Sequence, residues 1–451
     1  MKHPGTHPLI TWPAPESTIA WRHAEAISCG RFLADVIAVA ATLPECQHVI
    51  NTCSDRYLFM VGFAAALVRR QITLLPPSRV TGVVVGIAAE YDDCYLLADT
   101  HVGDGALPSF CLTLPTHPPA FMGAVPVVEL ERIAAIVFTS GSTGRATANF
   151  KPWRTLIEGA RLNATTQLAH QDPSVILVAT VPQQHMYGFE TTIMLPLMGR
   201  CAIHCGRPFY PEDVRNALAE VPHPRILVTT PVHLRALVAS TTQMPIASAI
   251  WSATAPLSTA LAARSEQLFQ APLREIFGCS EAGTFATRLT SRGEAWRLHD
   301  AFRMKPKDYG AILYADHLPQ PVRLHDSVEM LDGHHFRVLG RTTDLVNIAG
   351  KRASLGDLNA RLLSIPGVRD GVIFMPEAPA GASSLRTAAM VVAPGMTRAQ
   401  LLDALRELID PAFLPRPLVL VDALPRNETS KLPRAAVLQH FAEYAGASGN
   451  D

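Results

Sequence analysis

The sequence predicts an α/β fold with two domains: a large N-terminal domain of mixed and parallel sheets with packed helices, and a small, mobile C-terminal α+β lid domain. Short apolar runs rich in branched residues alternate with helical patterns, which favours largely parallel sheets. The chain has 451 residues, 48% of them hydrophobic, enough for more than one buried core. A turn pattern ends near residue 341, and the remainder is long enough for one small domain. We therefore expect domains at 1–341 and 342–451.

Individual elements follow from the hydrophobic pattern. The apolar run 57–68 is about half the length needed to span a bilayer, so we expect a buried helix there, followed by a strand. Asp332-Gly333 is expected at the turn of a hairpin. Thr397 and Gln400 have capping-box spacing ahead of an apolar helical face formed by Leu401, Leu405, Leu408 and Ile409. The other expected strands are 132–138, 174–180, 225–230, 370–375 and 388–394, and the other expected helices are 232–240 and 258–269.

Composition excludes several classes of function. Lys+Arg and Asp+Glu both number 39, so the balanced charge gives no support for binding to nucleic acid or to an acidic membrane. The N-terminal segment is too rich in Pro and His for a secretory signal, and no transmembrane segment is expected. The eight cysteines are scattered, and the pair Cys201 and Cys205 is expected to be ordinary. These features predict a cytoplasmic enzyme.

The stretch "FTSGSTGRATANF", residues 138–150, has the composition of a phosphate-binding loop. Gly141 and Gly144 permit close approach of a ligand to the backbone. Ser140, Ser142 and Thr143 add hydroxyl groups beside backbone N–H donors, and together they can form an anion-binding nest. No lysine follows Gly144, so this is not the common nucleotide P-loop. Alone, such a stretch is more often only a turn.

Further motifs raise the odds of a phosphate site. They are "VPQQHMYGF" at 181–189, "WSATAPLS" at 251–258, "FGCSEAG" at 277–283, the long segment 324–352 with "GRTTDLVNIAGKR", and "LPRNETSKLPR" at 424–434. In this order, and with the loop above, they resemble the signatures of the adenylate-forming ligases: acyl-CoA synthetases, aryl-acid ligases, luciferases and adenylation domains of peptide synthetases. The resemblance covers roughly residues 50–440.

The resemblance implies two half-reactions. A carboxylate attacks the α-phosphate of ATP to give acyl-AMP and pyrophosphate, and a thiol then displaces AMP. The first step brings anions together, so it needs counter-charge and alignment more than a protein nucleophile. ATP and Mg²⁺ are the implied cofactors, and Glu281 with Thr143 would bind the metal, a hard cation suited to oxygen ligands.

The resemblance also assigns nucleotide-binding residues. Ser280 would contact the α-phosphate, Asp326 would accept from both ribose hydroxyls, and Arg341 would reach the same ribose or the phosphate. Phe277 stands where the family usually has Tyr. The full nucleotide set is Thr139, Ser140, Gly141, Ser142, Thr143, Gly144, Ala253, Thr254, Ala255, Phe277, Gly278, Cys279, Ser280, Asp326 and Arg341.

By the same resemblance, the catalytic residues are Lys431, His185 and Glu281. Lys431 would bring a compact positive charge from the small domain to the carboxylate and the α-phosphate. His185 belongs to the acid-binding segment. The implied acid-binding residues are His185, Tyr187, Gly188, Ser252, Ala253 and Gly278, with Cys279 nearby.

Some positions depart from the family pattern. Thr343 holds the place of the usual hinge residue, so Thr342 and Thr343 are expected to form the pivot of the small domain. The proline and lysine usual after the loop are Ala146 and Thr147 here, and Lys151 is a candidate to supply the missing charge. On the side of the thiol acceptor, the resemblance implies Gly350, Lys351 and Arg352.

The acid and the acceptor are the open part of this interpretation. The compact chain and "FTSGSTG…KPW" resemble ligases of aryl-polyene and xanthomonadin-type pigment clusters, which load a hydroxybenzoate onto an acyl carrier protein. A small aromatic acid, 3- or 4-hydroxybenzoate, and a carrier-protein phosphopantetheine are therefore expected. A ligase that joins fatty or aryl acids to free CoA is the alternative.

Two hypotheses from other classes remain open. The first is a phosphotransferase that uses "GSTG" as a nucleotide loop, which would release ADP rather than AMP and pyrophosphate. The second is a degenerate member of the family that binds an acyl ligand or a carrier protein without catalysis, as the altered loop and hinge allow.

Overall fold

The structure is a computed structural model, and it divides into two compact units. The first consists of Met1–Gly293 with Ala315–Gln320, and the second of Glu294–Tyr314 with Pro321–Asp451. The residues that the structure describes are 5–12, 14–101, 107–116, 120–140, 146–169, 171, 174–199, 201–307, 310–341, 345–348, 351–376, 386–427 and 431–447.

One sheet of the first unit is parallel except at one edge. Strand β10 pairs antiparallel with β9, and the remaining neighbours run parallel to one another. Its order is β10 (Ala146–Pro152), β9 (Ile133–Ser140), β5 (Ile72–Leu75), β4 (His48–Asn51), β6 (Cys94–Ala98) and β7 (Ser109–Cys111). The predicted phosphate loop connects β9 to β10. A short antiparallel pair, β1 (Thr6–Pro8) with β8 (Val127–Glu129), completes this part of the unit.

A second sheet carries most of the predicted ligand-binding segments. Its strands from β15 to β2 are parallel, whereas β16 and β3 pair antiparallel with their neighbours. In the first unit its order is β16 (Gly283–Arg288), β15 (Leu273–Cys279), β14 (Ala249–Ser252), β13 (Arg225–Thr229), β11 (Ile176–Ala179), β12 (Ala202–His204), β2 (Thr18–Arg22) and β3 (Glu25–Ser28). The ends of β14 and β15 lead into two of the predicted motifs.

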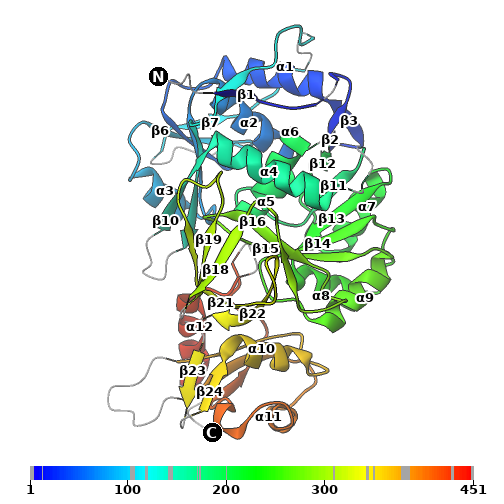
Figure 1. Cartoon of the computed structure of the whole chain (residues 1–451), viewed down its shortest axis with the longest axis vertical. Coiled ribbons are helices and arrows are strands. Elements are labelled where there is room, and N and C mark those ends of the chain that lie inside the picture. The colour runs from blue at the N-terminus through cyan, green and yellow to red at the C-terminus, as the bar shows by residue number, and fades with distance from the viewer. Residues whose placement is uncertain are drawn as a thin grey trace. The chain divides into compact units, whose positions relative to one another are not determined.

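Helices cover both faces of this second sheet. On one face, α7 (Pro211–Glu220), α8 (Pro231–Ala239) and α9 (Thr259–Phe269) pack against Leu227 and Ile250, and they appear in green in Figure 1. On the other face, Val228 and Trp251 belong to a larger core. The helical segments of that core are α1 (Cys29–Ala40), α2 (Arg56–Val68), α4 (Trp153–Gln167), α5 (Met186–Phe189), a π-helix (Glu190–Met194) and α6 (Leu195–Gly199).

Helix α2 confirms the expectation of a buried helix at 57–68. It begins after Asp55, whose carboxylate accepts from the backbone N–H groups of Tyr57 and Leu58. Every residue from Arg56 to Leu67 is buried. Within the described part of the chain, no helix is both long enough and apolar enough to cross a membrane. Helix α3 (Thr81–Ala88) packs separately, against β5 and β6.

The second unit begins with two groups of three antiparallel strands. Strand β22 (His335–Arg341) lies between β17 (Trp296–Leu298) and β21 (Asp326–Met330), and the other sheet contains β18 (Arg303–Lys307), β19 (Gly310–Tyr314) and β20 (Val322–Leu324). The turn predicted at Asp332-Gly333 is confirmed, because it joins β21 to β22. The Asp332 carboxylate accepts from two backbone N–H groups of the turn, and these bonds lower its pKa to about 2.

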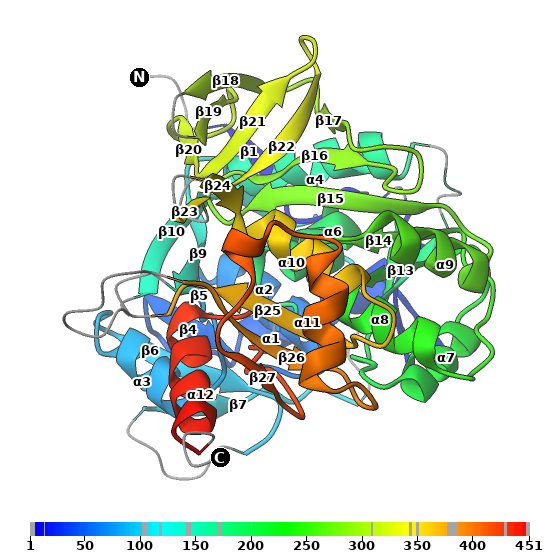
Figure 2. The same cartoon turned by 90° about the horizontal axis from the view of Figure 1, so that it is seen from below.

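The C-terminal part of this unit is an α+β structure. A hairpin of β23 (Leu345–Ile348) and β24 (Lys351–Ser354) precedes α10 (Leu355–Ser364). A sheet of β25 (Asp370–Phe374), β26 (Ala388–Val392) and β27 (Leu418–Leu420) follows. Helices α10 and α11 (Arg398–Arg406) pack on one face of this sheet, and α12 (Arg434–Ala447) packs on the other. Figure 2 shows the three helices around these strands.

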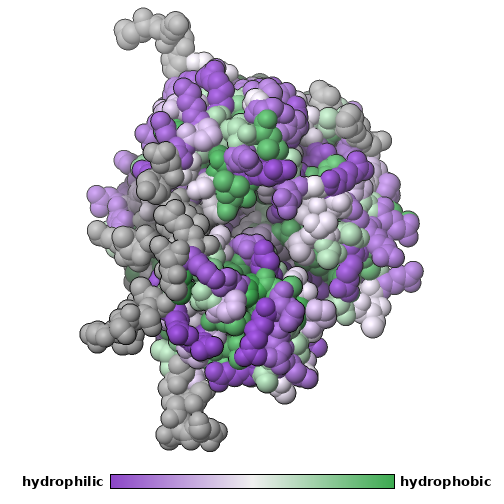
Figure 3. Space-filling model, turned by 60° about the horizontal axis from the view of Figure 1, so that its bottom comes forward, coloured by the Kyte–Doolittle hydropathy of each residue, from purple (hydrophilic) through white to green (hydrophobic). Residues whose placement is uncertain are grey.

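The α/β fold class predicted from the sequence is confirmed, as are the strands and helices expected from the apolar runs. The boundary between the two compact units lies earlier in the chain than residue 341, because strands β17 to β21 belong to the second unit. The functional boundary between 1–341 and 342–451 stays a prediction. The face in Figure 3 shows hydrophilic residues over most of its surface, with smaller hydrophobic groups between them.

Candidate active site

The predicted acid-binding segment is a tight corner followed by a single helical turn. Helix α5 begins after His185, and Gly188 lies within it. A Cβ on Gly188 would approach the carbonyl oxygen of Pro182 to 1.9 Å, so only glycine fits this corner. The corner is also held by Gln183, whose amide donates to the Cys53 carbonyl (2.8 Å). The sequence motif is therefore a fixed structural feature.

A hydrogen bond joins this segment to the end of β14. The Tyr187 hydroxyl donates to the Trp251 carbonyl (3.1 Å), next to the predicted turn at 252–255. Burial raises the pKa of Tyr187, so its hydroxyl stays protonated and can donate. The residues predicted to bind the acid and those predicted to bind adenine thus lie side by side.

The turn after β14 has an unusual backbone. Thr254 has a φ of +82°, a conformation in which a β-branched residue is strained and glycine is favoured. The resembling "SGGAPLS" turn has glycine at this position. Ser252 Oγ and Thr254 Oγ1 are buried, and neither has a hydrogen-bond partner within the described residues. Two hydroxyl groups and a strained backbone therefore mark this turn as a candidate ligand site.

The motif with Ser280 and Glu281 forms the turn between β15 and β16. Cys279 pairs with Gly283, so the three residues between them make the turn. The Glu281 side chain is exposed, whereas Phe277 is partly buried and packs on Phe285 with ring centroids 4.9 Å apart. Cys279 is partly buried, and desolvation of its thiol raises its pKa to about 12. A neutral thiol there suits a structural residue better than a nucleophile.

Lys151 does not face solvent in the manner expected of a replacement for the loop lysine. It lies on β10, its exposed fraction is 1%, and its ammonium donates to the Glu281 carbonyl (2.7 Å). Burial lowers the pKa of Lys151, while the charge of Glu190 raises it. Lys151 therefore binds the backbone of the Ser280–Glu281 turn, a contact that the sequence does not reveal.

Glu190 is a buried carboxylate that sequence reasoning missed. Its Oε2 accepts from the backbone N–H (3.0 Å) and the hydroxyl (2.9 Å) of Thr284. Burial raises its pKa, while the Thr284 hydrogen bonds and Lys151 lower it. The available signal was one acidic residue inside the apolar segment "MYGFETTIMLPL". Buried carboxylates need partners, and here they lie at the start of β16.

The predicted phosphate loop is only partly described. Thr139 and Ser140 end β9, opposite Thr147 and Ala146 of β10. Gly141, Ser142, Thr143 and Gly144 lie outside the described residues, so their predicted contacts stay predictions.

The second unit contains predicted site residues in three separate segments of the chain. Asp326 and Arg341 are direct cross-strand partners on β21 and β22. Lys351 donates to Asp410 (2.7 Å), a bond that lowers the pKa of Asp410. Lys431 is exposed, and its backbone exchanges hydrogen bonds with Asn427. Some predicted residues lie outside the described part of the structure. They are the hinge residues Thr342 and Thr343, Gly350, and the side chains of Arg341 and Arg352.

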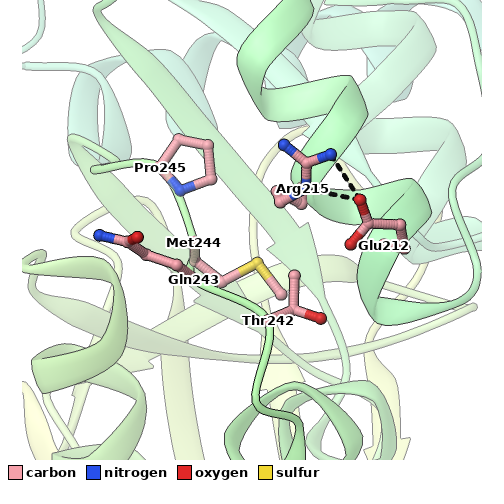
Figure 4. Close-up of a pocket in the computed structure, with 6 residues that line it drawn as sticks. All are labelled: Glu212, Arg215, Thr242, Gln243, Met244 and Pro245. Carbon is pink, nitrogen blue, oxygen red and sulfur yellow. Dashed lines mark hydrogen bonds and ion pairs between the residues drawn. The ribbon is translucent and has the colours of Figure 1, made fainter.

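A separate surface hollow lies between α7 and the segment Thr242–Pro245. Figure 4 shows Glu212 and Arg215 on the helix, joined by a hydrogen bond from Arg215 Nε (2.7 Å), facing that segment. None of its six lining residues belongs to the predicted site. We therefore assign this hollow no part in the reaction.

Comparison with known proteins places the chain in a family. The model of the AMP-binding enzyme family matches residues 35–311, and the chain belongs to this family. The match includes the loop at 139–144, the acid-binding segment and the Ser280–Glu281 turn. The family confirms the adenylate-forming class of enzyme that the motifs indicate.

Two curated relatives of the chain are named 4-coumarate–CoA ligases. The chain is 30% identical over 234 residues to a 4-coumarate–CoA ligase of Halorhodospira halophila, which is 50% of this chain and 55% of that protein. It is 27% identical over 238 residues to a 4-coumarate–CoA ligase of Rhodobacter capsulatus, 53% of this chain and 59% of that protein. The matches thus span a little more than half of these curated relatives.

A solved structure shows the same fold over nearly the whole chain. It is O-succinylbenzoate coenzyme A synthetase from Bacillus subtilis, in complex with ATP and magnesium ion. The TM-score is 0.79 and the identity 14%, covering 96% of this chain and 100% of that one. At this identity the likeness establishes the fold alone, which is the predicted one of a large α/β part and a C-terminal α+β part.

Proposed function

We propose that this protein is an ATP-dependent, AMP-forming acid–thiol ligase. A carboxylate oxygen of the acid attacks the α-phosphorus of ATP, and the bond to pyrophosphate breaks. A thiolate then attacks the acyl carbon of the acyl-AMP, and AMP leaves. One observation within the family-matched part of the chain carries this proposal. Tyr187 of the acid segment bonds to Trp251, next to the 252–255 turn, and Glu190, next to the acid segment, bonds to Thr284, close after the Ser280–Glu281 turn.

The chain's own residues have distinct tasks in this reaction. Ser280 binds the α-phosphate, the loop from Thr139 to Gly144 binds the outer phosphates, and Asp326 accepts from the ribose hydroxyls. Lys431 compensates the charge that develops when carboxylate and phosphate approach each other. The direct pairing of Asp326 with Arg341 across β21 and β22 supports their assignment to one ribose.

Glu281 fits the binding of Mg²⁺. Its carboxylate is exposed at a turn whose backbone is fixed by Lys151, and Mg²⁺ is commonly bound through one or two carboxylates together with substrate phosphates. Thr143 is proposed as the second protein ligand from sequence alone. When bound, the cation would neutralise phosphate charge.

We propose a small aromatic acid, 3- or 4-hydroxybenzoate, as the substrate. The two curated relatives are named for 4-coumarate, a hydroxylated aromatic acid, which supports the aromatic class. His185, Tyr187 and Gly188 are proposed to form one wall of the acid site. The hydroxyl groups of Ser252 and Thr254, which lack partners in the described structure, suit a substrate that carries a polar group.

The proposed acceptor is the phosphopantetheine thiol of an acyl carrier protein. This follows from the resemblance of the chain to pigment-cluster ligases. Free CoA is the second candidate, and the names of the curated relatives favour it. Both acceptors present the same thiol. They are distinguished by comparing thioester formation on the holo carrier protein with thioester formation on free CoA.

The decisive assay is ATP–pyrophosphate exchange across a panel of acids. We expect exchange with hydroxybenzoates, AMP as the nucleotide product, and thioester on the holo carrier protein in preference to free CoA. Exchange driven by octanoate but not by hydroxybenzoates would eliminate the aromatic proposal. ADP as the product would instead favour the phosphotransferase hypothesis.

Lys431→Ala tests catalysis directly. Removing a charge that stabilises a transition state typically costs two to three orders of magnitude, so we expect the exchange rate to fall about 100- to 1000-fold. The fold should survive, because Lys431 is exposed and its backbone makes the local hydrogen bonds. An unchanged rate would remove Lys431 from the mechanism, whereas a wild type without any exchange would favour the degenerate, non-catalytic alternative.

A further inference from the structure

Two buried, charged side chains converge on the turn that contains Ser280 and Glu281. Lys151 has an exposed fraction of 1% and Glu190 one of 4%. They come from β10 and from the π-helix after α5, segments that adjoin the phosphate loop and the acid-binding corner. Neither has a task in the proposed reaction, and neither faces solvent.

Their contacts hold the middle of the turn and the strand that follows it. The Lys151 ammonium donates to the carbonyl of Glu281, in the middle of the turn (2.7 Å). Glu190 Oε2 accepts two hydrogen bonds from Thr284, directly after it (3.0 and 2.9 Å). The turn is therefore fixed by one cation and one anion.

Gly283 makes the second contact possible. It has a φ of +73°, and a Cβ there would approach Glu190 Oε1 to 2.1 Å. Gly159 of α4 lies on another side of the same oxygen, where a Cβ would approach to 3.2 Å. Two glycines thus leave room for a carboxylate that is enclosed between α4 and the start of β16.

The local helix geometry points the same way. Residues 190–194 form a π-helix, a rare distortion that is frequently found at functional sites. Burying one charge is costly unless an opposite charge and hydrogen bonds compensate for it. An apolar pair would fill the space at lower cost, so stability alone does not account for two charges here.

We propose that Lys151 and Glu190 are positioning residues that hold the Ser280–Glu281 turn in the geometry needed for nucleotide and metal binding, and tie it to the phosphate loop and the acid-binding corner. Lys151 therefore does not take over the role of the lysine that is absent from the loop, because its ammonium binds protein backbone instead of phosphate. The kinetic part of this inference rests on the proposed function.

The test compares Lys151→Met, Glu190→Gln and the double variant in the full-length chain. Each single variant leaves one buried charge without its partner, so both should lose thermal stability. In the double variant neither buried charge of this pair remains, and the melting temperature should recover. Its turn still lacks the ammonium donor to Glu281, so positioning should not recover.

Kinetics separate a positioning role from a structural one. Loss of a residue that orients a metal-binding group typically lowers metal affinity or activity about 10- to 100-fold. We therefore expect the turnover number for ATP–pyrophosphate exchange to fall by that factor in Lys151→Met and in the double variant. The Mg²⁺ concentration for half-maximal rate should rise, while the KM for the acid should change little. A double variant that recovers stability and turnover together would overturn the inference.

A matched control is Asp35→Asn. Asp35 is also buried, at 1% exposure, and accepts from Tyr57 (2.7 Å) and Arg31 (3.0 Å) on and beside α1. Its loss should lower stability without changing turnover per folded molecule. A loss of turnover as large as that of Lys151→Met would show that burial of any charge matters, and would contradict a specific role for this pair.

A second readout does not depend on activity. Amide hydrogen exchange of the peptide spanning 279–289 should be faster in both single variants than in the wild type, and unchanged in Asp35→Asn. If the wild type shows no ATP–pyrophosphate exchange, the proposed function fails and this readout alone decides the positioning role. Equal protection of the Thr284 amide in all variants would overturn the inference even in an active enzyme.

Discussion

Gly188 shows how much of the candidate site depends on single residues. The corner before α5 brings the Pro182 carbonyl oxygen to 1.9 Å from the position that a Cβ on Gly188 would occupy. Contact at that distance cannot be relieved by a side-chain rotation, since the obstacle is backbone. The sequence motif marks this glycine, and the structure supplies its physical reason.

We expect Gly188→Ala to destabilise the protein. Overpacking a buried site costs typically 1–3 kcal/mol, and the backbone clash makes a loss of about 3 kcal/mol the reasonable expectation. Urea unfolding measures the change. The matched control is Gly86→Ala in α3, where a Cβ meets nothing within 4 Å, and removing a helix-interior glycine should stabilise by about 0.5–1 kcal/mol. Equal effects of the two changes would contradict the argument.

Lys151 is the residue whose role the sequence leaves undetermined. Its position after the altered loop indicates a substitute phosphate ligand, but its ammonium bonds to the Glu281 carbonyl. The partner is 130 residues away in the chain. No local pattern specifies such a contact, because it depends on how β10 packs against the turn between β15 and β16.

At the scale of elements, helix α11 is a case in which local sequence is sufficient. Thr397 accepts from the Gln400 backbone N–H, and Gln400 accepts from the Thr397 backbone N–H (2.8 Å). Both bonds form within four residues, so the spacing alone predicts them. The buried face of the helix contains Leu401 and Leu405, as the periodicity indicates.

Thr397→Ala should weaken this helix. Loss of an N-cap hydroxyl costs about 0.5–2 kcal/mol, because the first-turn N–H groups lose their acceptor. Native-state hydrogen exchange of the α11 amides measures the change in local opening free energy. Thr397→Ser keeps the hydroxyl and should restore most of the protection. If serine and alanine behave alike, the cap does not stabilise the helix.

The π-helix at Glu190–Met194 is an element that the sequence does not predict. Its residues read as a continuation of an apolar helical segment. The extra residue in the turn is compatible with the contacts of Glu190 to Thr284 and Gly283, which lie on a distant strand. Tertiary partners, rather than intrinsic propensity, account for this geometry.

At the scale of the whole molecule, each compact unit has its own hydrophobic core. The core of the C-terminal α+β part includes Leu362, Val391 and Leu405, while Ile250 and Leu227 belong to the first unit. Separate cores allow local unfolding of one unit without the other.

Leu405→Ala tests this independence. Leu405 has an exposed fraction of 0%, and truncation of a buried leucine costs about 2–5 kcal/mol. We expect faster amide exchange in β25, β26 and α11, whereas β13 and β14 keep the protection of the wild type. A uniform increase across both units would show that they unfold as one cooperative body.

The sequence by itself determined the α/β class, the positions of the strands and helices with the clearest apolar patterns, and the family. These depend on hydrophobic periodicity, on caps and turns within a few residues, and on motifs read in order along the chain. The candidate site residues were mostly named from motifs. The described ones lie in three segments, 185–188, 252–255 and 277–281. Hydrogen bonds and strand pairing connect these segments to residues next to them in the fold.

Only the tertiary structure decided what surrounds those motifs. It gave Lys151 a backbone partner, placed the Glu190 carboxylate against Gly283, and held Thr254 at a positive φ. Each of these depends on the approach of segments far apart in the chain. A buried charge can be recognised in a sequence only as an exception to an apolar pattern, and its partner is determined by packing.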